Sequence, residues 1–407
     1  NSVIATIDRE TMDFINPLLK RKAYIWWNFP VSDYVRDHLL MGPVYGNALD
    51  IKDEMEGFVS NPMEHAEASK IALYSVADYA WNLSDYDSDL SWKRAIKDLM
   101  PQHAAYLETF AAHNSDLGAN GHRFRREESV ALLPALEALL STYEKQHIID
   151  EDAWRQVNEE CSKIVTASDI LSVSQENQPF IAEITPWLMQ FKLVGQYGEA
   201  VLQMMRRAVT DKTGFETAYE HAKSLQLLMY KVDTSYNQNP YQPGIKSGSK
   251  VLLPTFYALF EASVGLYNQA YQAALDTRAV YMPYTWNSDV PQLAALPVLR
   301  KGKMGNVSPS NEVIHWQAGG EALLMMDQMR TLKSLTVDLG IADAPKLIRL
   351  EITADGQRWE AIPLQPVNGK TRFKAEVEGR NVQKIRLTNI TGQEQKVYFK
   401  QFGFEEK

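Results

Sequence analysis

The period of the hydrophobic pattern changes twice along this 407-residue chain, and that change constrains the fold more than any other feature. Two short apolar runs, 23–27 and 57–60, end at polar, turn-forming residues, as buried strands of a parallel sheet do. From residue 61 to about residue 274, apolar residues recur at helical spacing. After residue 277, short alternating runs are separated by Asp-Gly, Asn-Gly and Thr-Gly turns, which is typical of an all-β sandwich.

The order of these segments predicts a multidomain chain. The first part reads as helix, strand, helix and strand, the repeating unit of a (β/α)8 barrel of the TIM type. About 57 residues cannot close such a barrel, because a full one needs roughly 250. We therefore predict the C-terminal part of a catalytic β/α barrel over 1–60, an α-helical bundle over 61–275 and a discoidin-like β-sandwich over 279–407.

Capping signals predict two short helices in the barrel part. Asp8 is expected to cap a helix over Arg9–Ile15 that ends at Asn16-Pro17. Ser32 is expected to cap a second helix over Tyr34–Leu40, between the two predicted strands.

Composition excludes several classes of function. The net charge of −9 and a pI near 5.5 argue against a nucleic-acid-binding surface, which is usually basic. No run of 18 apolar residues is present, so we predict no membrane span. The single cysteine, Cys161, excludes an internal disulfide and most cysteine metal sites. We expect no metal and no cofactor, and the start at Asn1 suggests a processed product or a piece of a longer protein.

Aromatic and polar side chains gather where the two predicted strands end. Trp26, Asn28 and Asp33 lie at or after the end of the first strand, and Asn61 follows the second. In a β/α barrel this end of the strands faces the active site. An aromatic face beside amide and carboxylate groups suits a sugar, which offers an apolar ring face and a rim of hydroxyls. Because strand side chains alternate in direction, Trp26 and Asn28 share one face and Trp27 points into the core.

Each of these residues also has a purely structural interpretation. Asn28 can bond its own backbone in the Asn-Phe-Pro turn, and Asp33 can stabilise the first turn of a helix by about 0.3–1 kcal/mol. N-capping of the first bundle helix alone explains Asn61, which Pro62 follows. Trp26 can pack inside a barrel without touching a ligand. The residue types alone leave these alternatives open.

Two motifs carry a family resemblance. Trp-Trp-Asn-Phe-Pro-Val-x-Asp-Tyr at 26–34 and Gly-Phe-Val-Ser-Asn-Pro-Met at 57–63 resemble glycoside hydrolase family 84, the β-N-acetylglucosaminidases that include bacterial O-GlcNAcases and were once described as hyaluronidases. The resemblance extends along the whole chain. It implies a retaining exo-β-N-acetylglucosaminidase, periplasmic or secreted, whose sugar contacts match Trp26, Asn28, Asp33 and Asn61, with Asp33 holding hydroxyls on the far side of the ring.

The family's catalytic acids are two adjacent aspartates at the end of an earlier barrel strand. One orients the substrate's own acetamido group, whose oxygen attacks the anomeric carbon, and the other acts as general acid and then base, an exception to the two-carboxylate scheme. This sequence contains no Asp-Asp dipeptide. The resemblance therefore implies that the pair and the first part of the barrel lie upstream of Asn1, and that the chain alone is inactive. No catalytic residue is assigned to this chain.

The resemblance also names partners. It implies N-acetylglucosamine-containing glycans or O-GlcNAc-modified proteins as substrates, together with the missing N-terminal part of the same enzyme, and it leaves a homodimer open. The alternative is a non-catalytic glycan-binding scaffold. In that case the sandwich, whose Ile-Thr-Ala-Asp-Gly-Gln-Arg-Trp run at 352–359 resembles discoidin-like domains, would be the binding module.

Overall fold

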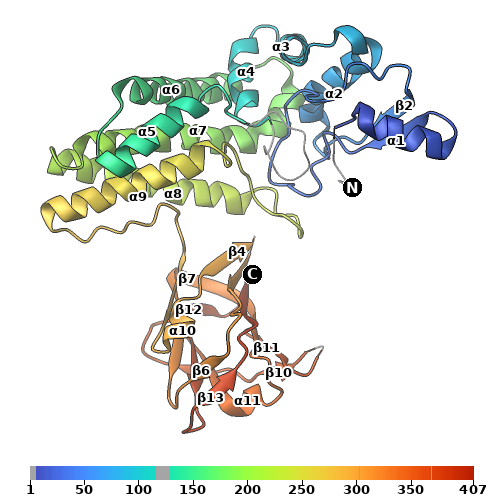
Figure 1. Ribbon diagram of the computed structural model, residues 1–407. Coiled ribbons are helices and arrows are strands. Elements are labelled where there is room, and N and C mark those ends of the chain that lie inside the picture. The colour runs from blue at the N-terminus through green and yellow to red at the C-terminus, as the bar shows by residue number, and fades with distance from the viewer. Residues whose placement is uncertain (1–5, 116–127, 302, 368) are drawn as a thin grey trace. The chain divides into compact units, whose positions relative to one another are not determined.

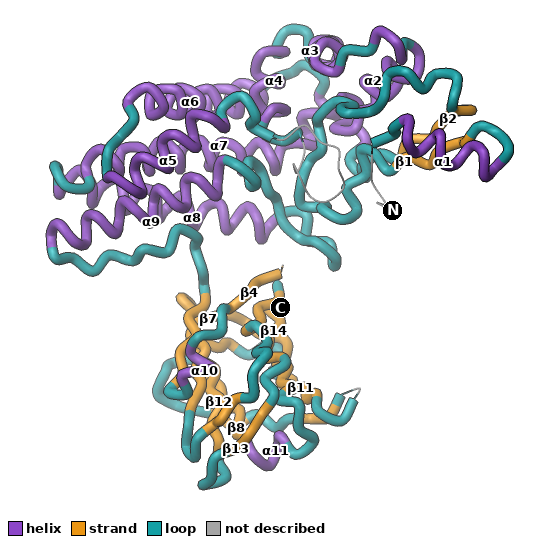
Figure 2. The backbone as a smooth tube through the Cα atoms, in the orientation of Figure 1, coloured by secondary structure: helices purple, strands orange, loops and turns teal. Residues whose placement is uncertain are grey.

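The chain divides into two compact units, Asn1–Tyr281 and Met282–Lys407. The computed structural model describes residues 6–115, 128–301, 303–367 and 369–407 (Figures 1 and 2). The first unit holds one small parallel sheet and long helices, and the second is built mainly of antiparallel strands. The predicted sequence of a β/α segment, a helical segment and a β-sandwich is therefore confirmed. The boundary at residues 60 and 61 lies inside the first unit and stays a prediction.

The small sheet consists of two parallel strands, β1 (Ala23–Trp27) and β2 (Met55–Ser60). One face of this sheet contributes to an apolar cluster with α1 and α2. Trp27 lies in this cluster, stacked on Phe29 at 4.8 Å between ring centroids and edge-on to Phe58 at 5.8 Å. Burial of these aromatic rings fixes which face of the sheet points away from solvent.

Helix α1 begins where the sequence predicts but ends later. The side chain of Asp8 accepts a hydrogen bond from the backbone of Thr11, as an N-cap does. The expected end at Asn16-Pro17 is wrong, because α1 spans Arg9–Leu19 and includes Pro17 in its last turn. Asn16 does not form a turn there: it accepts from Ala23 N at 2.9 Å and donates to Glu54 O at 2.8 Å, and so ties α1 to the sheet.

The helix predicted over Tyr34–Leu40 does not form, and this segment is a series of turns. Long-range hydrogen bonds explain the difference. The backbone carbonyls that a helix would use internally, those of Tyr34, Arg36 and Asp37, accept hydrogen bonds from the helical part of the unit instead. The donors are the side chains of Gln242, Asn237 and Trp187, respectively. These donors are more than 140 residues away, so local capping signals could not reveal them.

The remaining helices of the first unit form a bundle. In chain order they are α2 (Ala66–Trp81), the 3-10 turn η1 (Leu83–Asp85), α3 (Ser88–Leu99), α4 (Ala104–Ala112), α5 (Leu133–Gln146), α6 (Glu151–Val173), α7 (Gln178–Arg207), α8 (Lys212–Ser235) and α9 (Leu252–Tyr271). The 30-residue α7 is central and packs against α6, α8 and α9 (Figure 1). Gly198 permits this packing, since a Cβ there would lie 2.6 Å from Cys161 Sγ. Apolar spacing alone predicts one helix over 91–112, but the structure has two there, α3 and α4. The same spacing predicts a helix that begins at Arg125, which lies outside the described residues.

The second unit is organised around β7 (Glu321–Asp338), an 18-residue strand. β7 pairs with four others, β3 (Tyr284–Ser288), β11 (Arg372–Glu376), β12 (Asn381–Asn389) and β14 (Gln401–Glu406). The shorter elements are α10 (Pro291–Ala294), β4 (Val298–Lys301), β5 (Met304–Val307), β6 (Ile314–Trp316), α11 (Ala344–Leu347), β8 (Ile348–Thr353), β9 (Glu360–Ala361), β10 (Gln365–Pro366) and β13 (Gln395–Val397). The apolar run 280–282 also predicts a strand from the sequence, and this prediction is wrong, since β3 begins at Tyr284.

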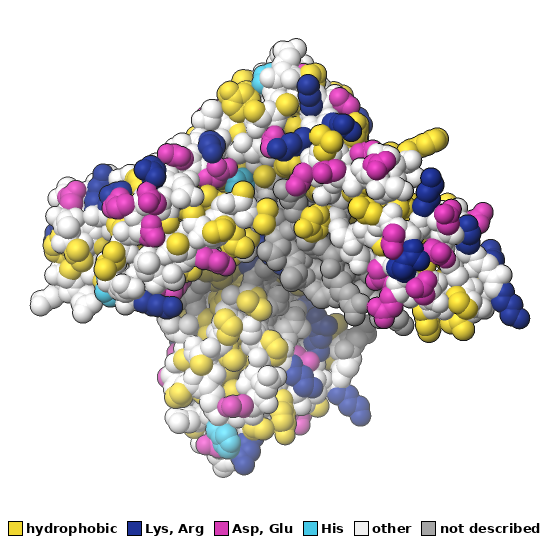
Figure 3. All heavy atoms as spheres, turned by 45° about the horizontal axis from the view of Figure 1, so that its top comes forward, with side chains coloured by type: hydrophobic (Ala, Val, Ile, Leu, Met, Phe, Trp, Pro, Cys, Tyr) yellow, Lys and Arg dark blue, Asp and Glu magenta, His cyan; other side chains and the backbone are white. Residues whose placement is uncertain are grey.

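The surface carries both signs of charge. On the face shown in Figure 3, basic side chains are interspersed with acidic ones. Arg9 is an example: it pairs with Asp50 at 2.7 Å and lies 3.7 Å from Glu54. Among the described residues, no helix is both long enough and apolar enough to cross a membrane.

Candidate functional site

Three of the four predicted sugar contacts lie together at the carboxyl ends of β1 and β2. The indole Nε1 of Trp26 donates to Asn28 Oδ1 at 2.9 Å. The amide Nδ2 of Asn61 donates to the same oxygen at 3.2 Å. The side-chain oxygen of Asn28 therefore joins the indole ring of Trp26 and the amide of Asn61 in one hydrogen-bonded group.

The backbone reinforces this arrangement. The N–H of Asn61 and the N–H of Phe29 both donate to the carbonyl of Trp27 at 3.0 Å. This shared acceptor joins the segment after β2 to the segment after β1. The register of the parallel pair, Trp27 opposite Ser60, brings the two ends level.

The structural interpretation of Asn61 as an N-cap is wrong. Helix α2 begins at Ala66 with His65 in the N-cap position, so Asn61 lies in the loop that precedes it. Its amide bonds to Asn28 rather than to the first turn of a helix. The side chain is therefore available for a role at the end of the sheet.

The two tryptophans point in opposite directions, as the strand alternation predicts. Trp26 is 69% exposed and Trp27 is 3% exposed. Tyr24, two residues before Trp26, is on the same face and is 63% exposed. The site therefore has an open aromatic face, with the amides of Asn28 and Asn61 at one end of it.

Asp33 lies apart from this group. It is exposed in the segment that follows β1, five residues beyond Asn28. No hydrogen bond between Asp33 and Trp26, Asn28 or Asn61 is present in the described part of the chain. The carboxylate faces solvent, so it could accept hydrogen bonds from a ligand without first breaking an internal one.

The loop from residue 237 to 249 braces this segment, and the sequence did not predict that. Gln242 accepts from the backbone of Arg36 at 2.7 Å and donates to the carbonyl of Tyr34, the residue next to Asp33. Arg36 in turn pairs with Glu64 at 2.7 Å, three residues beyond Asn61. The only available signal was the asparagine- and glutamine-rich composition of the loop, which does not identify a partner.

The chemistry of the group suits a neutral polyol. Amide groups both donate to and accept from hydroxyls, and exposed indole and phenol rings suit an apolar ring face. Within the described residues, no group of three or more His, Cys, Asp and Glu side chains could hold a metal ion. The hydrogen-bonded group of Trp26, Asn28 and Asn61 contains no general acid, because none of these three side chains ionises near neutral pH.

Three protein-family models match consecutive parts of the chain. Residues 1–112 match beta-N-acetylglucosaminidase, residues 128–260 match the bacterial GH84 post-catalytic domain, and residues 275–338 match carbohydrate binding module family 32. The four predicted site residues all fall in the first of these segments.

Two curated relatives match a short part of the chain. The chain is 27% identical over 82 residues to the protein O-GlcNAcases of Rattus norvegicus and Mus musculus, which is 20% of this chain and 9% of theirs. The chain thus spans under a tenth of these curated relatives.

Solved structures extend the likeness over more of the chain. CpGH84D is 27% identical, with a TM-score of 0.58 over 65% of this chain and 44% of its own. CpGH84B is 23% identical, with a TM-score of 0.55 over 63% and 42%. A mutant O-GlcNAc hydrolase of Thermobaculum terrenum is 22% identical, with a TM-score of 0.53 over 69% and 57%. For CpGH84B and the Thermobaculum terrenum protein, which are less than 25% identical to this chain, the likeness concerns the fold alone.

Proposed function

Because this chain belongs to glycoside hydrolase family 84, we propose that it supplies part of the sugar pocket of a retaining exo-β-N-acetylglucosaminidase that removes O-GlcNAc. The observation that carries the proposal is the hydrogen-bonded group of Trp26, Asn28 and Asn61 at the ends of two adjacent parallel strands. In β/α barrels this is where substrates bind.

Within the proposed pocket, Asn28 has the central position. Its Oδ1 accepts from two donors, so the plane of the amide is fixed before a sugar arrives. A fixed amide loses less conformational entropy on binding than a mobile one. Trp26 supplies an apolar wall, and Asn61 offers a second amide to the sugar hydroxyls.

Asp33 is proposed to select the sugar. A carboxylate that accepts two hydroxyl hydrogen bonds discriminates against an epimer, because the epimer would leave it unpaired. The side chain of Gln242 bridges the carbonyl of Tyr34 and the N–H of Arg36, on the two sides of Val35, and limits movement of this segment. Asp33 thus lies on a braced segment rather than on an isolated loop.

Replacing Asp33 tests this role in the complete enzyme. We expect Asp33→Ala to lower kcat/KM for an aryl N-acetyl-β-glucosaminide at least about tenfold, since a hydrogen bond to a charged group contributes about 1.5–3 kcal/mol. Asp53→Ala, in the turn before β2, is the control. Unchanged kinetics for Asp33→Ala would remove it from the site.

The chemical step is proposed to be substrate-assisted, with both catalytic acids outside this chain. The acetamido oxygen attacks the anomeric carbon while one acid protonates the leaving oxygen, and water then opens the cyclic intermediate with retention. The residues described above bind and orient the sugar but transfer no proton. Accordingly, we expect no turnover by this chain alone and turnover by an enzyme extended upstream by roughly 200 residues. Equal turnover by both would contradict the proposal.

A non-catalytic glycan-binding scaffold is the second candidate. The observation that favours it is the match of residues 275–338 to a carbohydrate-binding module. Hydrolysis by the extended enzyme that a thiazoline transition-state mimic abolishes would favour the glycosidase, and glycan binding without any hydrolysis would favour the scaffold. For either function we propose a periplasmic or secreted location.

A further inference from the structure

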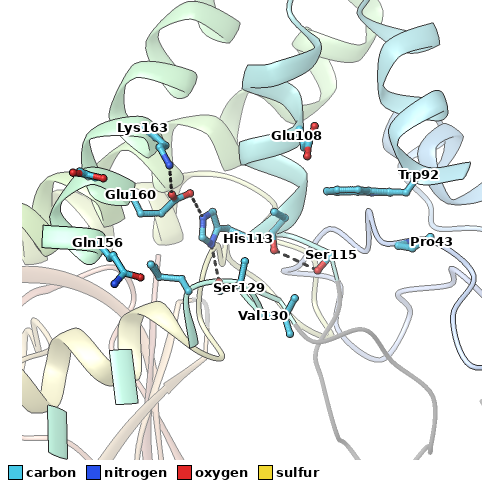
Figure 4. A pocket seen from close by; sticks show the side chains of 14 residues that line it. Pro43, Trp92, Glu108, His113, Ser115, Ser129, Val130, Gln156, Glu160 and Lys163 are labelled. Carbon is cyan, nitrogen blue, oxygen red and sulfur yellow. Dashed lines mark hydrogen bonds and ion pairs between the residues drawn. The ribbon is translucent and has the colours of Figure 1, made fainter. Parts of the chain in front are cut away.

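His113, which follows α4, bridges a serine and a glutamate beside a cavity of about 310 Å³. Its Nδ1 lies 2.7 Å from Ser129 Oγ, and its Nε2 lies 3.2 Å from Glu160 Oε1. The imidazole is 3% exposed, and all three residues line the cavity (Figure 4). None of them takes part in the sugar site.

The hydrogen bonds assign the proton on the neutral imidazole. A carboxylate only accepts, so Nε2 carries the hydrogen that Glu160 receives. Nδ1 is then the basic nitrogen, and the hydroxyl of Ser129 donates to it. This is the order of roles in an acid–base–nucleophile triad: the acid orients the base, and the base faces the hydroxyl proton.

Glu160 is held in the ionised state. Its hydrogen bond to His113 is the largest cause, partly opposed by burial, and Lys163 adds an ion pair at 3.0 Å. Together these contacts lower the pKa of the Glu160 carboxyl to about 2. A carboxylate that stays charged at neutral pH can stabilise an imidazolium next to it.

The backbone at Ser129 is unusual. Its φ is +59°, in the left-handed region that residues other than glycine rarely adopt. The residue is held there because its N–H donates to the carbonyl of Ala112 at 2.9 Å and its own carbonyl accepts from Leu132 and Leu133. A serine with positive φ on a sharp turn that leads into a helix, here α5, shares these two features with a nucleophile elbow, in which the serine also follows a strand.

The two residues after Ser129 provide hydrogen-bond donors. Val130 and Ala131 both line the cavity, and no acceptor among the described residues receives either backbone N–H. In a nucleophile elbow, the N–H of the residue after the serine stabilises the oxyanion of the tetrahedral intermediate. Ser129, His113, Val130 and Ala131 therefore all line the same cavity.

A second group of a serine, a histidine and an acid in the same unit shows what distinguishes the Ser129–His113–Glu160 group. His38 lies 2.8 Å from Asp37 Oδ1 and 2.6 Å from Ser249 Oγ. However, the two N–H groups that follow Ser249 both donate to Glu128, at 2.7 and 3.2 Å. The two N–H groups that follow Ser249 thus already have an acceptor, unlike those that follow Ser129, so the Asp37–His38–Ser249 group serves as a matched control.

We propose that Ser129, His113 and Glu160 form a second hydrolytic site that cleaves carboxylic esters with short acyl groups. Ser129 Oγ attacks the carbonyl carbon while its proton moves to His113 Nδ1. The carbon–oxygen bond to the alcohol breaks, and the alcohol leaves with that proton. Water, deprotonated by His113, then attacks the acyl-serine, the bond between the acyl carbon and Ser129 Oγ breaks, and His113 returns the proton to Ser129 Oγ, so that ester and water give acid and alcohol.

The cavity lining sets the substrate class. Pro43, Trp92 and Val130 offer apolar surface for a short acyl chain, and Gln156 and Lys163 offer polar groups for the alcohol side (Figure 4). A volume of about 310 Å³ holds a small ester but not a long-chain lipid.

A fluorophosphonate probe and 4-nitrophenyl acetate test the proposal on this chain as it stands. We expect the probe to label Ser129, located by tandem mass spectrometry of the digested protein. We expect Ser129→Ala to abolish labelling and to lower ester hydrolysis at least about a hundredfold, and Glu160→Gln to lower it at least about tenfold. Ser249→Ala should leave both unchanged.

Two results would overturn the proposal: no label on Ser129 in the folded wild-type chain, or equal ester hydrolysis by wild type and Ser129→Ala. Circular-dichroism melting shows whether each variant folds. Should Ser129→Ala fail to fold, the labelling of the wild-type chain decides. Neither result depends on the glycosidase proposal, because the probe and the ester contain no sugar.

Discussion

The two faces of the β1–β2 sheet differ in burial and in chemistry. One face carries Trp27 and Phe58, packed in an apolar cluster against the helices. The opposite face carries Trp26 and Asn28, with the indole largely exposed and hydrogen-bonded to the amide. Adjacent tryptophans on one strand thus have different tasks: Trp27 stabilises the fold, and Trp26 remains available to a ligand.

This difference means that stability and binding can be changed separately. Substitutions on the buried face should lower the free energy of unfolding. Substitutions on the open face should alter sugar binding and leave the unfolding transition nearly unchanged. Three substitutions, taken from the largest expected effect to the smallest, test the distinction.

Trp27→Ala should give the largest effect. Truncating a fully buried aromatic residue removes apolar burial and leaves a cavity, so we expect the free energy of unfolding to fall by about 3–5 kcal/mol. Trp26→Ala, on the exposed face, should change it by no more than about 0.5 kcal/mol. Urea unfolding followed by tryptophan fluorescence and circular dichroism measures both. Equal losses of unfolding free energy in the two variants would show that the two faces contribute equally to stability, contrary to the account.

Asn28→Ala should affect binding rather than stability. The substitution removes the acceptor shared by Trp26 and Asn61, so both lose their fixed orientation. We expect kcat/KM of the complete enzyme to fall by a factor of about 10–100, corresponding to about 1.4–2.7 kcal/mol. Asn82→Ala, at an exposed asparagine after α2, is the matched control. If both variants behave alike, the amide group is not part of the site.

Gln242→Ala should give the smallest effect, because this residue acts through the segment that carries Asp33. Losing its two hydrogen bonds to residues 34 and 36 should lower kcat/KM about three- to tenfold, mainly through KM. Gln238→Ala is the control. In the described part of the chain, the Gln238 side chain donates to the carbonyls of Asp233 and Tyr236, at and just after the end of α8, and not to the segment that carries Asp33. A change in kcat alone, or the same change in both variants, would argue against the brace.

Features with a local cause were predictable from the sequence. The N-cap at Asp8 depends on a residue and the helix that follows it directly, and the opposite directions of Trp26 and Trp27 depend on strand alternation alone. The change from helical to alternating period also predicted that a β-sandwich follows the helices. In these cases neighbouring residues determine the outcome, so propensity and period are sufficient.

Features with a distant cause were not predictable. The segment 34–40 has a good capping signal, yet its carbonyls bond to side chains such as Gln242 and Trp187, which are far along the chain. Asn61 has an equally good signal, but its amide bonds to Asn28. The Ser129–His113–Glu160 chain joins three separate segments, and no sequence motif connects them.

A crystal structure of the complete enzyme with a bound N-acetylglucosamine thiazoline would test the central claim most directly, namely that the open face of the β1–β2 sheet binds the sugar. The account predicts a sugar ring beside Trp26, with its hydroxyls within hydrogen-bond distance of the side chains of Asn28, Asp33 and Asn61. A ligand bound elsewhere, with the Trp26–Asn28–Asn61 group left facing solvent, would contradict it.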